Sequence, residues 1–216
     1  MTSFNFPPWT NKIRPLAGAL GAGGLVYVVC LVWWGFSPKT TEVGFQPVQP
    51  IGYSHALHAG KLGLDCRYCH NTVDRAAHAA IPPTETCMNC HGMVKTKSAK
   101  LAALRESWAT DKPVDWVKVH DLPDYVYFNH SAHVTRGVGC ASCHGRIDKM
   151  EVVHQENTLA MGWCLDCHRA PEAHLRPAEL VTQMDYVPER PQLEVGAELR
   201  KAHNINPPTD CSTCHR

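Results

Sequence analysis

The chain of 216 residues carries 21 Lys and Arg against 20 Asp and Glu, and its formal net charge of +1 gives no support to nucleic-acid binding through a basic surface. Its 11 Cys, 14 His, 16 Pro and 15 Gly, with only 19% charged residues, exclude collagen-like, coiled-coil and fully disordered chains. So many Cys and His indicate that something other than side-chain packing holds much of the fold.

An uncharged run covers residues 16–36 near the N-terminus. At about 1.5 Å per residue, a helix of this length spans about 30 Å, the thickness of the hydrocarbon core. Lys12 and Arg14 precede the run, so the positive-inside rule predicts a cytoplasmic N-terminus. No A-x-A cleavage site follows, and we expect residues 1–36 to be an uncleaved anchor in the lipid bilayer. Cys30 in this run is expected to be a small apolar residue without a partner.

Residues 17–24 of the anchor are mostly Gly and Ala, which predicts packing against the membrane helices of another protein. Residues 37–52 are rich in Pro and Thr and are expected to form an extended linker. The domain that follows, residues 53–216, is expected to lie on the outer, periplasmic side of the membrane.

Ten of the eleven cysteines lie in five C-x-x-C units, and a histidine follows every unit directly. We number these motifs from first to fifth: Cys66–His70, Cys87–His91, Cys140–His144, Cys164–His168 and Cys211–His215. The C-x-x-C-H motif is typical of c-type haem attachment, in which two thiols bond the vinyl groups and the histidine binds the iron. A zinc ribbon needs no histidine after each pair and uses pairs two at a time, so five motifs fit it poorly.

The motifs therefore predict five covalently bound haems. The attachment residues would be Cys66, Cys69, Cys87, Cys90, Cys140, Cys143, Cys164, Cys167, Cys211 and Cys214. The proximal axial ligands would be His70, His91, His144, His168 and His215. Five haems bring ten propionates, so the loaded domain is expected to be acidic.

An internal repeat divides the domain. An H-x-x-H unit, His55 with His58, leads into the first and second motifs over residues 53–91. A second unit, His130 with His133, leads into the third and fourth motifs over residues 128–168. The fifth motif stands apart in residues 203–216, and the 42 residues before it predict that its haem lies at an edge of the cluster.

Nine histidines remain for the distal side of five irons, which favours bis-His haems closed to substrate. Residues i and i+3 of a helical turn point the same way, so the two H-x-x-H units are the favoured distal ligands. The fifth distal ligand stays open among His78, His154, His203, Met150 and Met161. His120 and His174 are expected to bond propionates or backbone, although His174 remains a possible ligand.

Regular secondary structure is sparse. Apolar spacing predicts a helix over residues 96–110, and a second is expected over residues 194–203. Short helical turns are expected to carry the motifs, and no convincing sheet is visible. The fold class is therefore mainly α and irregular, with one N-terminal transmembrane helix and a multihaem domain.

The segment Phe128–His133 ahead of the third motif resembles class III multihaem cytochromes c, in which the two histidines serve different haems. Over nearly the whole chain, the anchor, the five motifs, residues 122–133 and the block Met161–His168 resemble the pentahaem cytochrome c component of bacterial alternative complex III. This resemblance implies a non-catalytic electron-transfer subunit of a quinol oxidoreductase in the bacterial cytoplasmic membrane. It also implies its partners, namely an iron–sulfur subunit, polytopic quinol-binding subunits and a monohaem cytochrome c.

Two rival functions remain to be compared with this one. A catalytic pentahaem nitrite reductase replaces one proximal histidine with lysine, whereas all five motifs here end in histidine. A free-standing membrane-anchored quinol dehydrogenase shares the anchor, normally has four haems, and remains the alternative.

Overall fold

The computed structural model describes residues 6–36 and 42–215. The chain divides into two compact units, residues 1–42 and 43–216, and each is described by itself. Parts of the predicted N-terminal segment (residues 1–5) and linker (residues 37–41), and the terminal residue 216, lie outside the described residues.

The first unit is the predicted anchor helix. A short 3-10 turn, η1 (Pro8–Lys12), leads into α1 (Ile13–Gly35). Residues 8–35 have a mean hydropathy of 2.0 in their most apolar window, and the helix is long and apolar enough to cross a membrane. Apart from the neighbouring residues and backbone of the helix itself, no atom of the described chain lies within 4 Å of the place that a Cβ would take at Gly18, Gly21, Gly23 or Gly24.

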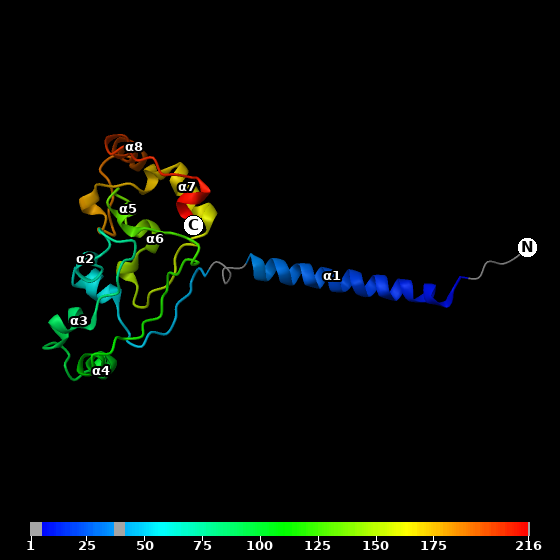
Figure 1. The fold of residues 1–216 in the computed structure, drawn as a ribbon, viewed down its shortest axis with the longest axis horizontal. Helices are drawn as coiled ribbons and strands as arrows, with labels where there is room; N and C mark the ends of the chain where they lie inside the picture. Colours follow the sequence, from blue (N-terminus) through cyan, green and yellow to red (C-terminus); the bar gives the residue numbers. More distant parts are fainter. Residues whose placement is uncertain (1–5, 37–41, 216) are drawn as a thin grey trace, which may run out of the picture. The chain divides into compact units, whose positions relative to one another are not determined.

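The second unit consists of short helices and irregular connections (Figure 1). The elements of its first half are η2 (Ala56–Lys61), α2 (Cys66–Cys69), α3 (Thr84–His91), η3 (Ala99–Leu101) and α4 (Ala102–Thr110). The second half contains α5 (His130–Val134), α6 (Ala141–His144), η4 (Ile147–Lys149), α7 (Met161–Arg169), η5 (Pro171–His174), η6 (Ala178–Leu180), α8 (Gln192–Ala202) and α9 (Cys211–Cys214).

The described residues contain two isolated β-bridges, Val126 with His215 and Val138 with Leu175, and no strand. The helical and irregular fold class is therefore confirmed. The helix expected over residues 96–110 is shorter than predicted, since α4 begins at Ala102 after the turn η3. The helix expected over residues 194–203 is α8, which begins two residues earlier.

Each C-x-x-C-H motif lies on or beside a short helix, α2, α3, α6, α7 or α9, as expected. In two of them the preceding aspartate caps the helix. Asp65 accepts the backbone N–H of Arg67 at 2.8 Å, and Asp210 accepts that of Thr213 at 3.1 Å. An N-cap carboxylate satisfies a free N–H and stabilises a turn too short to stand alone.

The two repeats are joined by matching backbone contacts. In one direction His130 and Ser131 donate their N–H groups to the carbonyls of Ala77 and Ala76, at 3.0 and 3.2 Å. In the other direction Ala56 donates to the carbonyl of Met150 at 3.0 Å. Each H-x-x-H turn is therefore bonded to the segment that follows the first motif of the other repeat.

Side-chain packing supplies little of the interior. Within the described residues only eight hydrophobic side chains are buried, among them Leu175 and Val181, the two that are almost fully buried. The closest helix packing is between α8 and η5, where Gly196 lies against the backbone of Glu172. Such a small core in a domain of this length fits the sequence-based expectation that bound groups complete the interior.

Candidate haem-binding site

The thiols of the five motifs lie in a row. Burial raises the pKa of Cys69, and the neighbouring thiol of Cys87 in the second motif raises it further. The thiol of Cys66 in the same first motif is a neighbour of the Cys140 thiol in the third, and their interaction lowers the pKa of Cys66 and raises that of Cys140. The first motif therefore lies between the second and the third.

The row continues toward the C-terminus. Burial, followed by the nearby thiols of Cys167 and Cys164 in the fourth motif, raises the pKa of Cys143 to about 12. Burial and the thiol of Cys214 in the fifth motif raise the pKa of Cys164. The spatial order of the motifs is therefore second, first, third, fourth, fifth, which differs from their order in the chain.

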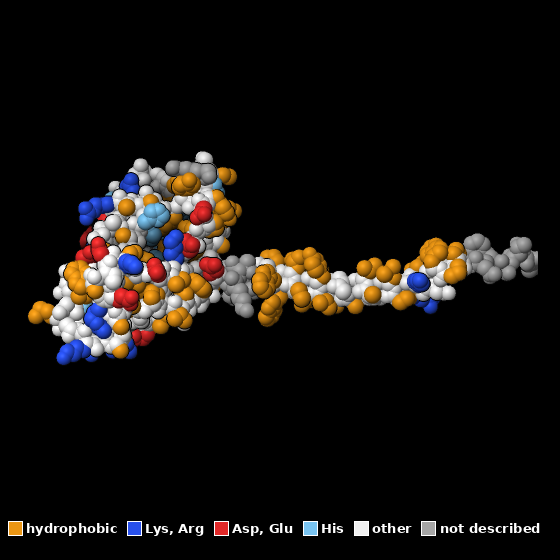
Figure 2. Space-filling model, turned by 60° about the horizontal axis from the view of Figure 1, so that its bottom comes forward, with side chains coloured by type: hydrophobic (Ala, Val, Ile, Leu, Met, Phe, Trp, Pro, Cys, Tyr) orange, Lys and Arg blue, Asp and Glu red, His pale blue; other side chains and the backbone are white. Residues whose placement is uncertain are grey.

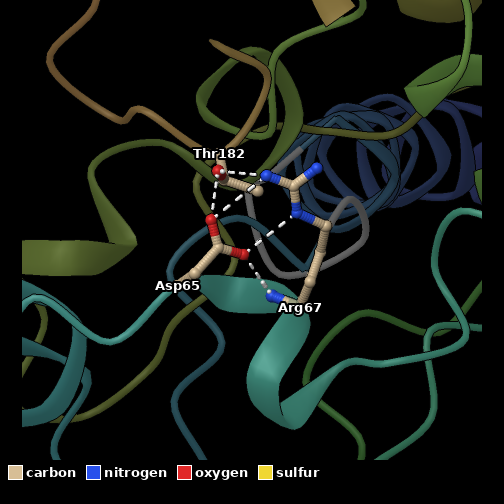
Figure 3. Close-up of polar contacts among 3 residues, drawn as sticks. All are labelled: Asp65, Arg67 and Thr182. Atoms are coloured by element: carbon tan, nitrogen blue, oxygen red, sulfur yellow. Dashed lines mark hydrogen bonds and ion pairs between the residues drawn. The ribbon is translucent and has the colours of Figure 1, made fainter. Parts of the chain in front are cut away.

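A polar cluster fixes the middle of this row (Figure 3). The carboxylate of Asp65 accepts hydrogen bonds from the guanidinium of Arg67 at 3.0 and 3.2 Å and from the hydroxyl of Thr182 at 2.8 Å. The Arg67 bonds hold the pKa of Asp65 at about 2, below its usual value of 3.8. Next to Thr182, the carbonyl of Val181 accepts the N–H of Cys140 at 3.0 Å. Residues 181–182 thus tie the first motif to the third.

Seven imidazoles share one hydrogen-bond arrangement, in which Nδ1 faces a backbone carbonyl at 2.7–3.3 Å. They are His58, His70, His91, His130, His133, His168 and His215. A carbonyl only accepts, so each Nδ1 carries the hydrogen and each Nε2 keeps its lone pair. Metal-binding histidines use this arrangement to fix tautomer and orientation.

Three pairs of imidazoles have the spacing of rings that bind one metal from opposite sides. Metal–imidazole bonds are about 2 Å long and the bonded nitrogen lies about 1 Å from the ring centre, so such rings have centres about 6 Å apart. The ring centres of His58 and His91 are 6.2 Å apart, and those of His133 and His168 are 6.1 Å apart. His130 and His144 have centres 6.4 Å apart and planes within 9°.

Burial favours the neutral form of three of these rings, His130, His133 and His144, and neutral imidazole is the form that binds a metal. Burial lowers the pKa of His130 and His133, although their bonds to the carbonyls of Ala77 and Asn129 act in the opposite direction. It also lowers the pKa of His144 to about 3, with a further contribution from the neighbouring His120.

His55, the other favoured distal ligand, lies beside the proximal histidine of the first motif. Burial lowers its pKa to about 4, and His70 is the first of the neighbouring charges that lower it further. Its Nδ1 is buried without a hydrogen-bond partner, unlike that of His58 three residues later. A ring held by fewer bonds is more dependent on a metal bond for its orientation.

The fold does not gather the candidates for the fifth distal ligand around the fifth motif. His154 uses its Nε2 for a contact of 3.3 Å with Glu156, while Met150 is buried and Met161 is largely exposed. His78 and His203 are exposed. Within residues 42–215 the aromatic ring beside His215 is that of Tyr125, with centres 5.8 Å apart.

The sequence predicts that His120 bonds propionates or backbone. Its position in the fold is one that no pattern in the chain indicates. Its ring lies edge-on to His144, with centres 4.5 Å apart, too close for the two to share one metal from opposite sides. Both His120 Nε2 and His144 Nδ1 are buried without a partner. No periodicity or spacing around His120 marks this position.

Two cavities border the attachment cysteines. One of about 350 Å³ lies beside Cys66 and is lined by Gly60, Leu64 and Thr182. The other, of about 510 Å³, lies beside Cys87 and is lined by Ile81, Trp108 and Trp116. Cavities of this size suit a cofactor. Together with the ring spacings and the Nδ1 bonds, they show that the residues present fit haem.

The comparisons with known proteins agree with this geometry. The family described as cytochrome c7 and related cytochrome c matches residues 126–216, which hold the third, fourth and fifth motifs. A relative from Nitratidesulfovibrio vulgaris (strain Hildenborough), the multiheme cytochrome c subunit of menaquinone reductase, is 31% identical over 174 residues, covering 70% of this chain and 80% of the relative.

This similarity extends over most of both chains. The chain carries covalently bound c-type haems and belongs to the multihaem cytochrome c family, whose function is electron transfer.

Proposed function

We propose that the chain is an electron-transfer subunit with five c-type haems that works within a membrane quinone oxidoreductase complex. The observation that carries this proposal is the continuous row of five thiol pairs in the order second, first, third, fourth, fifth. Bound haem supplies one-electron exchange between Fe(III) and Fe(II). A row with two ends suits a protein that passes electrons between partners.

The proposed attachment residues are the ten motif cysteines, and the proximal ligands are the five motif histidines. Ring spacing supports His58 as the distal partner of His91, His133 as that of His168, and His130 as that of His144. His55 is then the distal partner of His70, the imidazole beside it. These pairings fill both axial positions of four irons, and the fifth distal ligand stays open among His78, His154, His203, Met150 and Met161. Haems closed in this way suit electron transfer, so the chain itself is proposed to be non-catalytic.

The protein's own residues orient and insulate these sites. The carbonyl of Ala80 holds the ring of His70, and that of Pro208 holds His168, at 2.8 and 2.7 Å. Burial lowers the pKa of His55, His130, His133 and His144, and burial of the surroundings is one means by which a protein sets a haem potential.

The proposed domains are a cytoplasmic end and anchor over residues 1–36, a linker over residues 37–52, and the pentahaem domain over residues 53–216. Within it, residues 53–91 and 128–168 are the repeats and residues 203–216 hold the fifth haem. The domain is proposed to face the periplasm of a bacterium, because residues 8–35 suit a membrane span and c-type haem is attached outside the cytoplasmic membrane.

The specific complex is proposed to be of the alternative complex III type, with an iron–sulfur subunit, polytopic quinol-binding subunits and a monohaem cytochrome c. The resemblance of residues 122–133 and 161–168 supports it. The relative from N. vulgaris, named as part of a menaquinone reductase, favours a second candidate in which the complex reduces menaquinone.

Purification of the full chain in mild detergent tests both candidates. Intact mass should show five covalent haems, and the co-purifying proteins should include an iron–sulfur protein and polytopic membrane proteins. Oxidation of added quinol by this preparation supports the first candidate, and reduction of menaquinone supports the second. A chain that purifies alone and oxidises quinol by itself would instead support a free-standing quinol dehydrogenase.

A further inference from the structure

A basic segment lies at one end of the row of motifs. Residues 92–118, here called the basic lobe, follow the second motif and contain six Lys and Arg against three Asp and Glu. The rest of the chain has fifteen Lys and Arg against seventeen Asp and Glu. In Figure 1, α4 of this lobe lies at the end of the haem domain opposite α7 and α8, and in Figure 2 Lys and Arg side chains gather at the lower end of the domain.

The lobe is held rigidly beside the second motif. The Ser107 hydroxyl lies 2.7 Å from that of Thr84 at the start of α3 and donates to the carbonyl of Lys112 at 2.5 Å. At its far end, Val117 exchanges two hydrogen bonds with the side chain of Gln49, at 2.8 and 3.0 Å. A surface fixed in this way presents its charges in a constant pattern, which lowers the entropic cost of docking.

The positive charges of the lobe are available. Lys95, Lys97, Lys100 and Lys112 are exposed, and within residues 42–215 none of them forms an ion pair. Exposed apolar side chains lie among them, with Met93 at 90% and Val94 at 54% of full exposure. Apolar side chains surrounded by charge are typical of protein–protein interfaces, in which charge steers the partner and apolar contacts hold it.

The lobe also borders the attachment site of the second haem, because Trp108 and Lys112 line the cavity beside Cys87. From these observations we infer that the basic lobe is the docking surface for an acidic protein partner that exchanges electrons at the second-motif end of the row. This inference rests on the proposed function for the electron exchange, and on the charge and exposure of the lobe for the binding.

The test uses the full-length haem-loaded chain in detergent and two probes that share one fold, native cytochrome c, which is basic, and succinylated cytochrome c, which is acidic. At low ionic strength the chain should bind the succinylated probe through the lobe, while the native probe reports binding to the acidic remainder of the loaded domain. The substitutions Lys97→Glu and Lys100→Glu together should weaken binding of the succinylated probe by at least about tenfold. The control pair Lys149→Glu and Lys201→Glu changes net charge equally away from the lobe and should weaken it by less than about twofold.

Electron transfer gives a second readout. After reduction of the chain, one electron passes from a ferrous haem to the ferric haem of the probe, and no bond forms or breaks. The lobe variant should slow this step with succinylated cytochrome c only, and added salt should abolish the difference. Equal loss in the lobe and control variants would overturn the inference.

A lipid surface is the competing occupant, and phosphatidylglycerol vesicles test it. If the lobe variant lost vesicle binding while its affinity for the succinylated probe stayed unchanged, the docking proposal would be wrong. Haem loading is measured separately in every variant. A chain with five haems whose binding of the succinylated probe is unaffected by the lobe substitutions overturns the docking surface alone, whereas a chain without haems overturns the proposed function.

Discussion

His130 donates the hydrogen of its Nδ1 to the carbonyl of Ala77, 2.8 Å away and 53 positions earlier in the chain. The same carbonyl accepts the backbone N–H of His130 at 3.0 Å. The first repeat therefore fixes the orientation of His130, the proposed distal ligand at the start of the second repeat. Because the ring faces His144 across 6.4 Å, the contact between repeats and the ligand geometry depend on each other.

This arrangement predicts different effects for the two histidines of the second H-x-x-H unit. His130→Ala should convert the haem of the third motif to high spin, and His133→Ala that of the fourth, because their rings face different proximal histidines. Electron paramagnetic resonance of the oxidised chain should lose a different low-spin signal in each variant. Added imidazole should restore both signals, since it replaces the missing ligand.

His174→Ala serves as the control and should leave all low-spin signals intact. If His130→Ala and His133→Ala removed the same signal, the proposed pairing would be wrong. His55→Ala should affect the haem of the first motif, and a loss of the third-motif signal in that variant would mean that the two repeats exchange their first distal histidines.

The sequence predicted those features that depend on local spacing. The motifs predicted the short helices on which the candidate attachment residues lie, and the apolar run predicted α1. The order of the motifs could not be predicted, because it depends on contacts between distant residues such as Thr182 with Asp65, 117 positions apart. The position of His120 against His144 likewise follows from tertiary packing and leaves no periodic pattern in the chain.

The packing of α8 on η5 should be intolerant of a single added methyl group. A Cβ at Gly196 would overlap the backbone of Glu172, whereas at Gly162 in α7 nothing lies within 4 Å. We expect Gly196→Ala to lower the free energy of unfolding by about 1–3 kcal/mol, the usual range for overpacking. Gly162→Ala should be neutral or slightly stabilising, as alanine favours a helix.

Thermal unfolding of the haem-loaded variants measures both effects. Since Arg200 and Glu172 form an ion pair at 2.5 Å across the same contact, Gly196→Ala should also expose the segment after the fourth motif to proteolysis. A variant as stable as the unsubstituted chain would show that α8 and η5 are not packed as described.

The cluster around Asp65 should stabilise the first motif in a pH-dependent way. Its pKa lies at about 2, below the usual 3.8, mainly through the hydrogen bonds from Arg67. A depressed carboxyl pKa adds stability above the usual value, and this is lost as pH falls through about 2. Asp65→Ala should lower stability at neutral pH by about 1 kcal/mol through the lost N-cap.

The loss should shrink as the pH of the measurement falls toward 2, because the reference chain then loses the same charge. Asp121→Ala is the control. Asp121 forms an ion pair with Lys118 in which both side chains are exposed, and such pairs add only about 0–1 kcal/mol to the free energy of unfolding. Equal destabilisation at every pH would show that capping alone, without the ion pair, accounts for the role of Asp65.

The second-motif end of the row offers a direct test through its axial ligand. The ring of His58 faces His91 at 6.2 Å and is oriented by the carbonyl of Ser54 at 2.8 Å, within the π-helical turn η2. His58→Met should replace a bis-His haem with a His/Met haem, which raises its reduction potential by on the order of 0.1 V or more. In a spectroscopic redox titration the reduction potential of one haem should shift upward. His78→Met, at an exposed position, should leave every potential unchanged. Because the second motif adjoins only the first, the haems of the other motifs should still exchange electrons with one another. A shift of two or more potentials by similar amounts would show that His58 does not serve a haem at the end of the row.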